Sequence, residues 1–251
     1  MAGRISDAAA DNAAFKGRGV PAGGSRGRRE RCACVPLYCI GVLAAAALVW
    51  AALLSRAGVT AMAGRTGRPL YRGGDGTGAA FIFAVRWDSS ALPALLEKLD
   101  EKGIKVTFAF SKEVIESAPQ TVRETAARGH ETALIAENGH ETGEELAYLS
   151  GRVEELTGEP PVTLLCPSGA AEGLTAQAEE AGLRAVVGSV DLRPIGDDPA
   201  GLERAVREQA FDGCIFIAEP TRAFAEAAAK IVDFVKNMGA DIVPTHKMLY
   251  N

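Results

Sequence analysis

Two histidines lie in one short stretch, GHETALIAENGHETG, which runs from Gly129 to Gly143. His130 and His140 each follow a glycine and precede Glu-Thr, and the whole chain has only three histidines. Imidazole nitrogens are frequent zinc ligands, and they exchange protons near neutral pH. The stretch therefore has three interpretations: a metal site, a duplicated turn, or the remnant of a site.

Five cysteines could also carry chemistry. Cys32, Cys34 and Cys39 lie at the edge of an apolar run and lack the spacing and partners of a zinc site. We interpret them as thiols at a membrane edge, where acylation can occur. Cys166 and Cys214 lie far apart in the sequence and are expected to be buried apolar residues.

The first part of the chain predicts a tail and an anchor. Residues 1–31 are basic and rich in Gly, Ala and Arg, so they are expected to be disordered and cytoplasmic. Residues 32–56 carry no charge until Arg56 and exceed the ~20 residues that cross a bilayer as a helix. Because the basic cluster precedes this run, we predict a single-pass cell-membrane protein with its C-terminal domain outside the cytoplasm.

A cleaved signal peptide is the alternative to the anchor. Ala61-Met62-Ala63 has the pattern of a cleavage site, but the apolar run is longer than usual for a signal peptide and Arg56 interrupts the approach. We favour the retained anchor. The Gly-rich residues 57–78 show no apolar periodicity and are predicted to be a linker.

From Ala79 onward, short apolar runs alternate with amphipathic ones. This alternation predicts an α/β fold in which helices cover a parallel sheet, either open or closed into a barrel. The net charge of −5 gives no reason to expect nucleic acid as a partner. The predicted strands are 79–85, 105–110, 131–136, 161–166, 184–190, 213–218 and 241–244.

The order of five phrases, GIKVTFAF, RGHET, PPVTLLCPSG, GSVDLRP and GCIFIAEPT, resembles the polysaccharide deacetylase family, also called the NodB-homology or carbohydrate esterase 4 family. FAVRWD at 83–88, followed by Leu92-Pro93, is most similar to the sporulation-type branch. The resemblance covers roughly residues 79–249. It implies a distorted (β/α)7-type barrel for a domain at 79–251, preceded by one transmembrane helix.

Members of that family hold a divalent metal, usually zinc, with one Asp and two His. A carboxylate serves as general base and another His as general acid. The resemblance places the metal Asp at Arg86, the base at or near Ala84, and the two His ligands at Ile135 and Gly139. An arginine is permanently charged and cannot bind a metal ion.

The remaining motifs are also altered. Leu165-Cys166-Pro167-Ser168-Gly169 stands where the family has Arg-Pro-Pro-Tyr-Gly, so the Arg and the Tyr are missing. Asp191 keeps an acidic residue, but Pro194-Ile195 replaces the Asp-Trp expected after it, and Glu219 replaces the general-acid His. The pattern fits a scaffold that has kept its core and lost its catalytic residues.

Other chemistry at the same mouth is not expected. Arg86 and Glu219 have opposite charges and could simply pair. Cys166 has no recognisable His partner, and Ser168 is not in a Gly-x-Ser-x-Gly motif. His130 precedes the ligand positions and is interpreted as a structural turn residue.

We therefore predict no catalytic residues and no metal site, with His140 the only residue kept as a candidate ligand. The expected function is a catalytically inactive, deacetylase-like domain that binds cell-wall glycan or an envelope protein. The alternatives are a divergent metal-dependent deacetylase, built from His140, Asp88, Asp191 and His246, or a structural role through oligomerisation. The residues predicted to line a substrate or partner groove are Arg86, Trp87, Asp88, Pro167, Ser168, Asp191 and Glu219.

Overall fold

The computed structural model describes residues 67–87 and 90–249, which belong to the compact unit Ala57–Asn251. The predicted tail 1–31 and the predicted anchor 32–56 lie outside the described residues. Within the described ranges, no helix is both long and apolar enough to cross a membrane.

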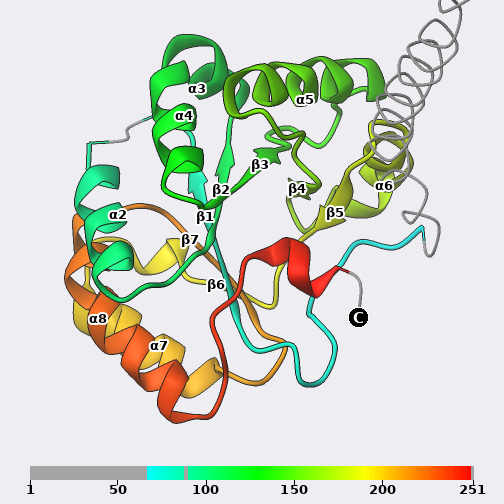
Figure 1. Cartoon of the computed structure of the whole chain (residues 1–251). Helices are drawn as coiled ribbons and strands as arrows, with labels where there is room; N and C mark the ends of the chain where they lie inside the picture. Colours follow the sequence, from blue (N-terminus) through cyan, green and yellow to red (C-terminus); the bar gives the residue numbers. More distant parts are fainter. Residues whose placement is uncertain (1–66, 88–89, 250–251) are drawn as a thin grey trace, which may run out of the picture. The chain divides into compact units, whose positions relative to one another are not determined.

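The predicted parallel α/β sheet is confirmed. Its seven strands are all parallel and lie in the order β5-β4-β3-β2-β1-β7-β6. The strands curl into a half-barrel whose carboxyl ends all meet at one rim (Figure 1). Their bounds are β1 Ala80–Val85, β2 Thr107–Phe110, β3 Glu131–Ile135, β4 Thr163–Leu165, β5 Arg184–Val186, β6 Val190–Asp191 and β7 Ile215–Ala218.

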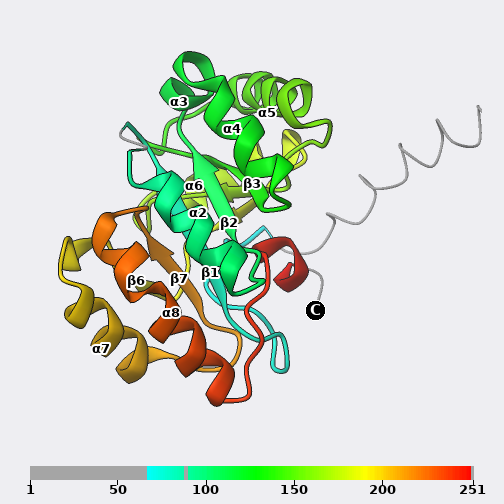
Figure 2. The same ribbon diagram turned by 60° about the vertical axis from the view of Figure 1, so that its left-hand side comes forward.

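Helices cover the outer face of the sheet, as Figures 1 and 2 show. Helices α2, α8 and α7 pack side by side over one part of the sheet, and α3 to α6 over the other. The longest helices begin at threonine caps, Thr142 and Thr221, whose hydroxyls accept backbone N–H groups. The helix bounds are α2 Leu92–Glu101, α3 Lys112–Ser117, α4 Pro119–Ala127, α5 Gly143–Thr157, α6 Ala171–Glu180, α7 Pro199–Gln209 and α8 Arg222–Asn237.

Strand alternation separates two cores. In β1, Phe81 and Phe83 face the helices, and Phe83 packs edge-on against Phe224 of α8. The alternate residues, Ala80 and Ile82 among them, face the inside of the curl and pack with other small or aliphatic side chains. The helix-facing core holds the large aromatics, so the fold is stabilised away from the rim.

The predicted strand 184–190 is wrong in one respect: it is two strands, β5 and β6, on opposite edges of the sheet. Gly188 divides them with φ +84°, and a Cβ there would lie 2.7 Å from Ile217 Cδ1. Seven flat strands would place the outer two about 29 Å apart. The four steps from Val186 to Val190 span at most about 14 Å, so the sheet must curl.

Two further expectations need correction. The predicted linker 57–78 extends too far, because Leu70 exchanges backbone hydrogen bonds with Ala185 and Val187 at the edge of β5. The contact is made by backbone hydrogen bonds at Leu70 alone. It therefore produces no apolar periodicity that the sequence could reveal. The predicted last strand, 241–244, forms only a single bridge, from Ile242 to Ala79.

A buried carboxylate closes the amino end of the sheet. Glu131 accepts hydrogen bonds from the Thr163 hydroxyl at 2.8 Å, the Thr107 hydroxyl at 2.7 Å and the His246 backbone N–H at 3.0 Å. Its side chain is only 7% exposed. The Thr245 hydroxyl lies 2.8 Å from that of Thr107, so this cluster fastens the short η3 helix, Thr245–Met248, below the sheet.

Replacing Glu131 with alanine should lower the free energy of unfolding by about 3 kcal/mol, because three buried donors lose an ionised acceptor. Urea denaturation measures this change. Glu124→Ala is the matched control, since Glu124 forms only an exposed pair with Arg128 and should cost less than ~1 kcal/mol. Equal effects of the two substitutions would contradict the role assigned to Glu131.

Candidate functional site

The carboxyl rim of the sheet holds two cavities, built by the residues that follow the strands. The first has a volume of about 470 Å³ and the second about 390 Å³. Arg86 lines both, so its side chain forms their shared wall. Cavities of several hundred cubic ångströms are usual for small-molecule sites.

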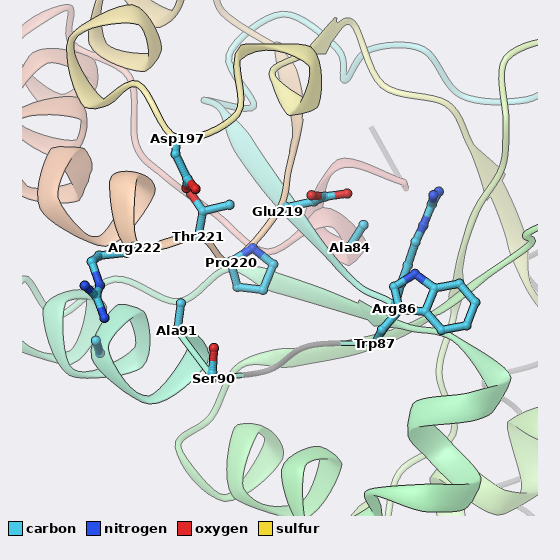
Figure 3. Close-up of a pocket in the computed structure, with 11 residues that line it drawn as sticks. Ala84, Arg86, Trp87, Ser90, Ala91, Asp197, Glu219, Pro220, Thr221 and Arg222 are labelled. Atoms are coloured by element: carbon cyan, nitrogen blue, oxygen red, sulfur yellow. The ribbon is translucent and has the colours of Figure 1, made fainter.

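The first cavity lies between the ends of β1 and β7 (Figure 3). Arg86 and Trp87 stand on one side, Arg222 on the opposite side, and the Glu219 carboxylate between them. The Trp87 ring is 74% exposed, an unusual position for a large apolar side chain. The lining residues are Ala84, Arg86, Trp87, Ser90, Ala91, Ala94, Asp197, Glu219, Pro220, Thr221 and Arg222.

The second cavity lies over the ends of β3, β4 and β5. It is walled by apolar strand ends such as Ile135 and Leu165, and its polar groups lie at the end of β6 and in the segments that follow the strands. Of the predicted groove residues, Pro167, Ser168 and Asp191 line it with Arg86, while Trp87 and Glu219 line the first cavity. Asp88 lies outside the described residues. The structure thus gathers the described groove residues at one rim, and their binding role stays a prediction.

Arg86 is held firmly by its backbone but not by its side chain. Ser111, fully buried at the start of α3, donates a hydrogen bond from its hydroxyl to the Arg86 carbonyl at 2.8 Å. The guanidinium makes no hydrogen bond and no ion pair with any described residue, and its Nε is buried without a partner. The ion pair with Glu219 considered from the sequence does not form.

Asp191 is neutralised by a residue that the sequence analysis did not single out. Arg193 binds it through two side-chain hydrogen bonds, Nε to Oδ1 at 2.8 Å and Nη2 to Oδ2 at 2.7 Å. Burial alone would raise the pKa of Asp191, but the hydrogen bonds from Arg193 outweigh it and hold that pKa below its usual range. In the sequence, the only sign of this pair was that Asp191 and Arg193 have opposite charges and are two residues apart.

Glu137 was also missed. It follows β3 by two residues and lines the second cavity, and its Oε1 is buried without a hydrogen-bond partner. Burial raises the pKa of Glu137 above its usual range, and the neighbouring Glu113 adds to the effect, while Arg86 opposes it. Its position after a strand of a parallel sheet was the available signal.

The two positions that the resemblance assigns to histidine ligands cannot hold a metal in this chain. Ile135, the last residue of β3, is 3% exposed and has no donor atom. Gly139 has φ +73°, and a Cβ there would lie 2.2 Å from the Ala170 Cβ. No group of three His, Cys, Asp or Glu side chains among the described residues is placed to hold a metal ion.

The histidines are dispersed. His140 is exposed on the loop before α5. His246 lies at the opposite end of the sheet, with its Nδ1 3.3 Å from Glu131 Oε2, so the idea that it could join Asp191 in an altered site is wrong. The sequence did not show at which end of the sheet His246 would lie.

His130 is a packed core residue, which agrees with the structural role expected for it. Its Nδ1 accepts a hydrogen bond from the Val106 N–H at 3.3 Å, and its ring packs edge-on against Phe108. Burial lowers its pKa from 6.5 to about 4, with the charge of Lys105 acting in the same direction. Burial also raises the pKa of Cys166 to about 12, so this thiol is a poor nucleophile.

Acid should destabilise the fold through His130. The unfolded chain binds a proton near pH 6.5 and the folded one only near pH 4, so this residue costs up to about 3 kcal/mol of stability as the pH falls across that window. His130→Asn keeps a hydrogen-bond acceptor but cannot titrate. Urea titrations at several pH values should show that the unfolding free energy of this variant depends less steeply on pH than that of the parent protein.

Gly139→Ala should be more destabilising than Gly158→Ala. Both glycines have positive φ, 73° and 85°, but only the former would push a Cβ into Ala170, since nothing lies within 4 Å of the Gly158 position. The strain of positive φ costs about 1 kcal/mol in each variant, so the difference in unfolding free energy reports the overlap. Ala170→Gly should remove that difference, and no rescue would mean that position 139 has room for a side chain.

No protein-family model matches the sequence, and no curated protein matches it. Solved structures do. Wild-type BA3943, a CE4 family pseudoenzyme from Bacillus anthracis, superposes with a TM-score of 0.67 at 19% identity, covering 74% of this chain and 70% of that one. A BA3943 mutant described as having restored enzymatic activity gives the same TM-score, 0.67, at 18% identity.

Active enzymes have the same arrangement of elements. The Bc1960 peptidoglycan N-acetylglucosamine deacetylase superposes with a TM-score of 0.64 at 22% identity, covering 71% of this chain and 91% of that one. PdaA of Bacillus subtilis, a family 4 carbohydrate esterase, gives 0.63 at 18% identity, with 73% and 86% covered. The domain therefore has the fold of the CE4 polysaccharide deacetylases, a fold that both active enzymes and a pseudoenzyme adopt.

Proposed function

We propose that this chain is a membrane-anchored member of the polysaccharide deacetylase family, of the sporulation-type branch, that binds a cell-envelope glycan without metal-dependent hydrolysis. The observation that carries the proposal is Arg86, a permanent cation at the position where the resemblance places the metal-binding Asp. Its guanidinium stands in the shared wall of both cavities. A cation there repels a metal ion instead of binding it.

The donor set does not fit zinc. A catalytic zinc site needs three protein ligands of the His, Cys, Asp or Glu type and one open position. Arg86, Ile135 and Gly139 supply none of the three, and the packing of Ala170 against Gly139 leaves no space for a replacement side chain in the present geometry. We derive no hydrolytic step through a metal for this chain.

The groups expected to move protons are missing as well. Ala84 stands near the position of the general base and has no titratable atom. Glu219 stands at the position of the general-acid histidine, so the imidazole that the family uses to donate a proton is absent there. With both groups changed, no base would activate a water to attack a bound amide, and no acid would protonate the leaving amine.

A glycan is supported as the ligand by the rim itself and by the neighbours of the fold. Trp87 offers an exposed flat apolar face beside hydroxyl and carboxylate groups. A sugar ring has an apolar face that can stack on the indole and hydroxyl groups that can form hydrogen bonds with these polar groups. The structural neighbours include a peptidoglycan deacetylase and a chitin deacetylase, whose fold this chain shares. An envelope protein as partner remains an outcome to be distinguished by experiment. The membrane location is proposed from residues 32–56 alone.

Metal analysis of the full-length protein, purified in detergent and dialysed against zinc, tests the proposal. The expected result is far less than one zinc per chain and no acetate release from N-acetylglucosamine oligomers. Stoichiometric zinc together with acetate release would establish the divergent deacetylase instead.

Two histidine variants sharpen that result. His140→Ala removes the one histidine that the sequence analysis kept as a candidate ligand, and His246→Ala removes a histidine at the amino end of the sheet. Any trace of zinc should be the same in both variants and in the parent. Loss of zinc and activity in His140→Ala alone would show that His140 is a ligand.

A further inference from the structure

The guanidinium of Arg86 is a charge at the rim that forms no ion pair with any described residue. It lines both cavities, its Nε is buried without a partner, and no described residue accepts a hydrogen bond from its side chain. A buried polar atom without a partner is costly, and a guanidinium has five N–H donors to satisfy. Such a group is satisfied best by an acceptor that it can bind through two parallel hydrogen bonds.

The second cavity offers Arg86 no such acceptor of its own. Asp191 already receives both side-chain hydrogen bonds that it can accept in bidentate geometry from Arg193. Glu137 is near enough to be affected by the charge of Arg86, but it forms no ion pair with it, and its own Oε1 is also without a partner. Since burial favours the neutral form of Glu137, this carboxyl opposes an incoming anion less than an exposed glutamate would.

We propose that the second cavity binds the carboxylate of an acidic sugar, with Arg86 as its bidentate partner. The proposal deepens the function proposed above and rests on it, because it assumes a rim that binds glycan without a metal ion. The cavity of about 390 Å³ can take a carboxylate together with part of the ring that carries it. Arg86 serves here as a binding and specificity residue.

The placement of the neighbouring groups sets the orientation of the sugar. Glu219 and Asp197 offset Arg86 and Arg222 in the first cavity. In the second cavity, Asp191 is already bound by Arg193 and burial favours the neutral form of Glu137, which leaves Arg86 to bind a carboxylate there. The first cavity keeps groups suited to the uncharged part of the ligand: the exposed face of Trp87 and the Thr221 side chain. In Figure 3, Trp87 lies beside Arg86, so a ring stacked on the indole could extend its carboxylate past the guanidinium.

The test uses two sugars that differ by one carboxylate-bearing group. N-acetylmuramic acid is N-acetylglucosamine with a lactyl ether, so the difference in their affinity for the full-length protein reports the lactyl group, and its dependence on Arg86 assigns the effect to the carboxylate. Calorimetric titration should show about tenfold or tighter binding of N-acetylmuramic acid, as expected for one charge-assisted bidentate contact. Arg86→Gln should remove the preference, and Arg86→Lys should restore only part of it, because an ammonium cannot form the paired hydrogen bonds.

Arg123→Gln is the matched control, since Arg123 is an exposed arginine on α4 that lines neither cavity. It should leave the preference unchanged, and thermal unfolding of each variant checks that the domain is folded. Equal affinity for the two sugars, or a preference that survives Arg86→Gln, would overturn the inference and leave the proposed glycan-binding function standing.

Two other results would also decide whether the second cavity binds an acidic sugar. Binding of a short peptide through its carboxylate, lost in Arg86→Gln, with no binding of N-acetylmuramic acid, would replace the acidic sugar with a protein partner. Stoichiometric zinc in the same preparation would instead refute the metal-independent function on which the inference rests.

Discussion

The short crossing from β5 to β6 is the constraint on which the rest of the domain depends. Val187, Gly188 and Ser189 connect the two outer strands of a seven-stranded sheet, and three residues cannot reach across a flat one. The sheet therefore curls, and all its carboxyl ends face a common centre. Gly188 makes the crossing possible because its positive φ and its contact with Ile217 leave no room for a side chain.

The same curl separates the contacts that stabilise the fold from the residues at the rim. The large aromatic residues, such as Phe83 and Phe216, pack between the sheet and the helices, and Glu131 fastens the amino end. Neither group reaches the carboxyl rim, where Arg86 and Glu219 stand. Substitutions at the rim would therefore alter charge and binding while the stabilising contacts remain intact.

Sequence patterns predicted what depends on local periodicity and missed what depends on folding in space. Alternating apolar runs located β1, β2, β3, β4 and β7 closely, since buried parallel strands are continuous apolar stretches. Nothing local reveals that Arg184–Val186 and Val190–Asp191 lie on opposite edges of the sheet, or that Glu131 meets His246. At the rim, the residues directly after strands were predictable. The position of Glu137 and the pairing of Arg193 with Asp191 depend on the conformation of the loops, which the sequence pattern did not give.

The chemical consequence of Arg86 follows from comparing a guanidinium with a zinc ion. Both are positive and both attract anionic oxygen, so the rim keeps the sign of a metal site. A guanidinium, however, has no empty coordination position for a water, and its permanent positive charge prevents it from acting as an acid or a base. It can therefore hold a carboxylate through directional hydrogen bonds but cannot generate a hydroxide nucleophile. Under the proposed function, Arg86 would make this rim a site of recognition rather than of hydrolysis, and its buried Nε has no hydrogen-bond partner among the described residues.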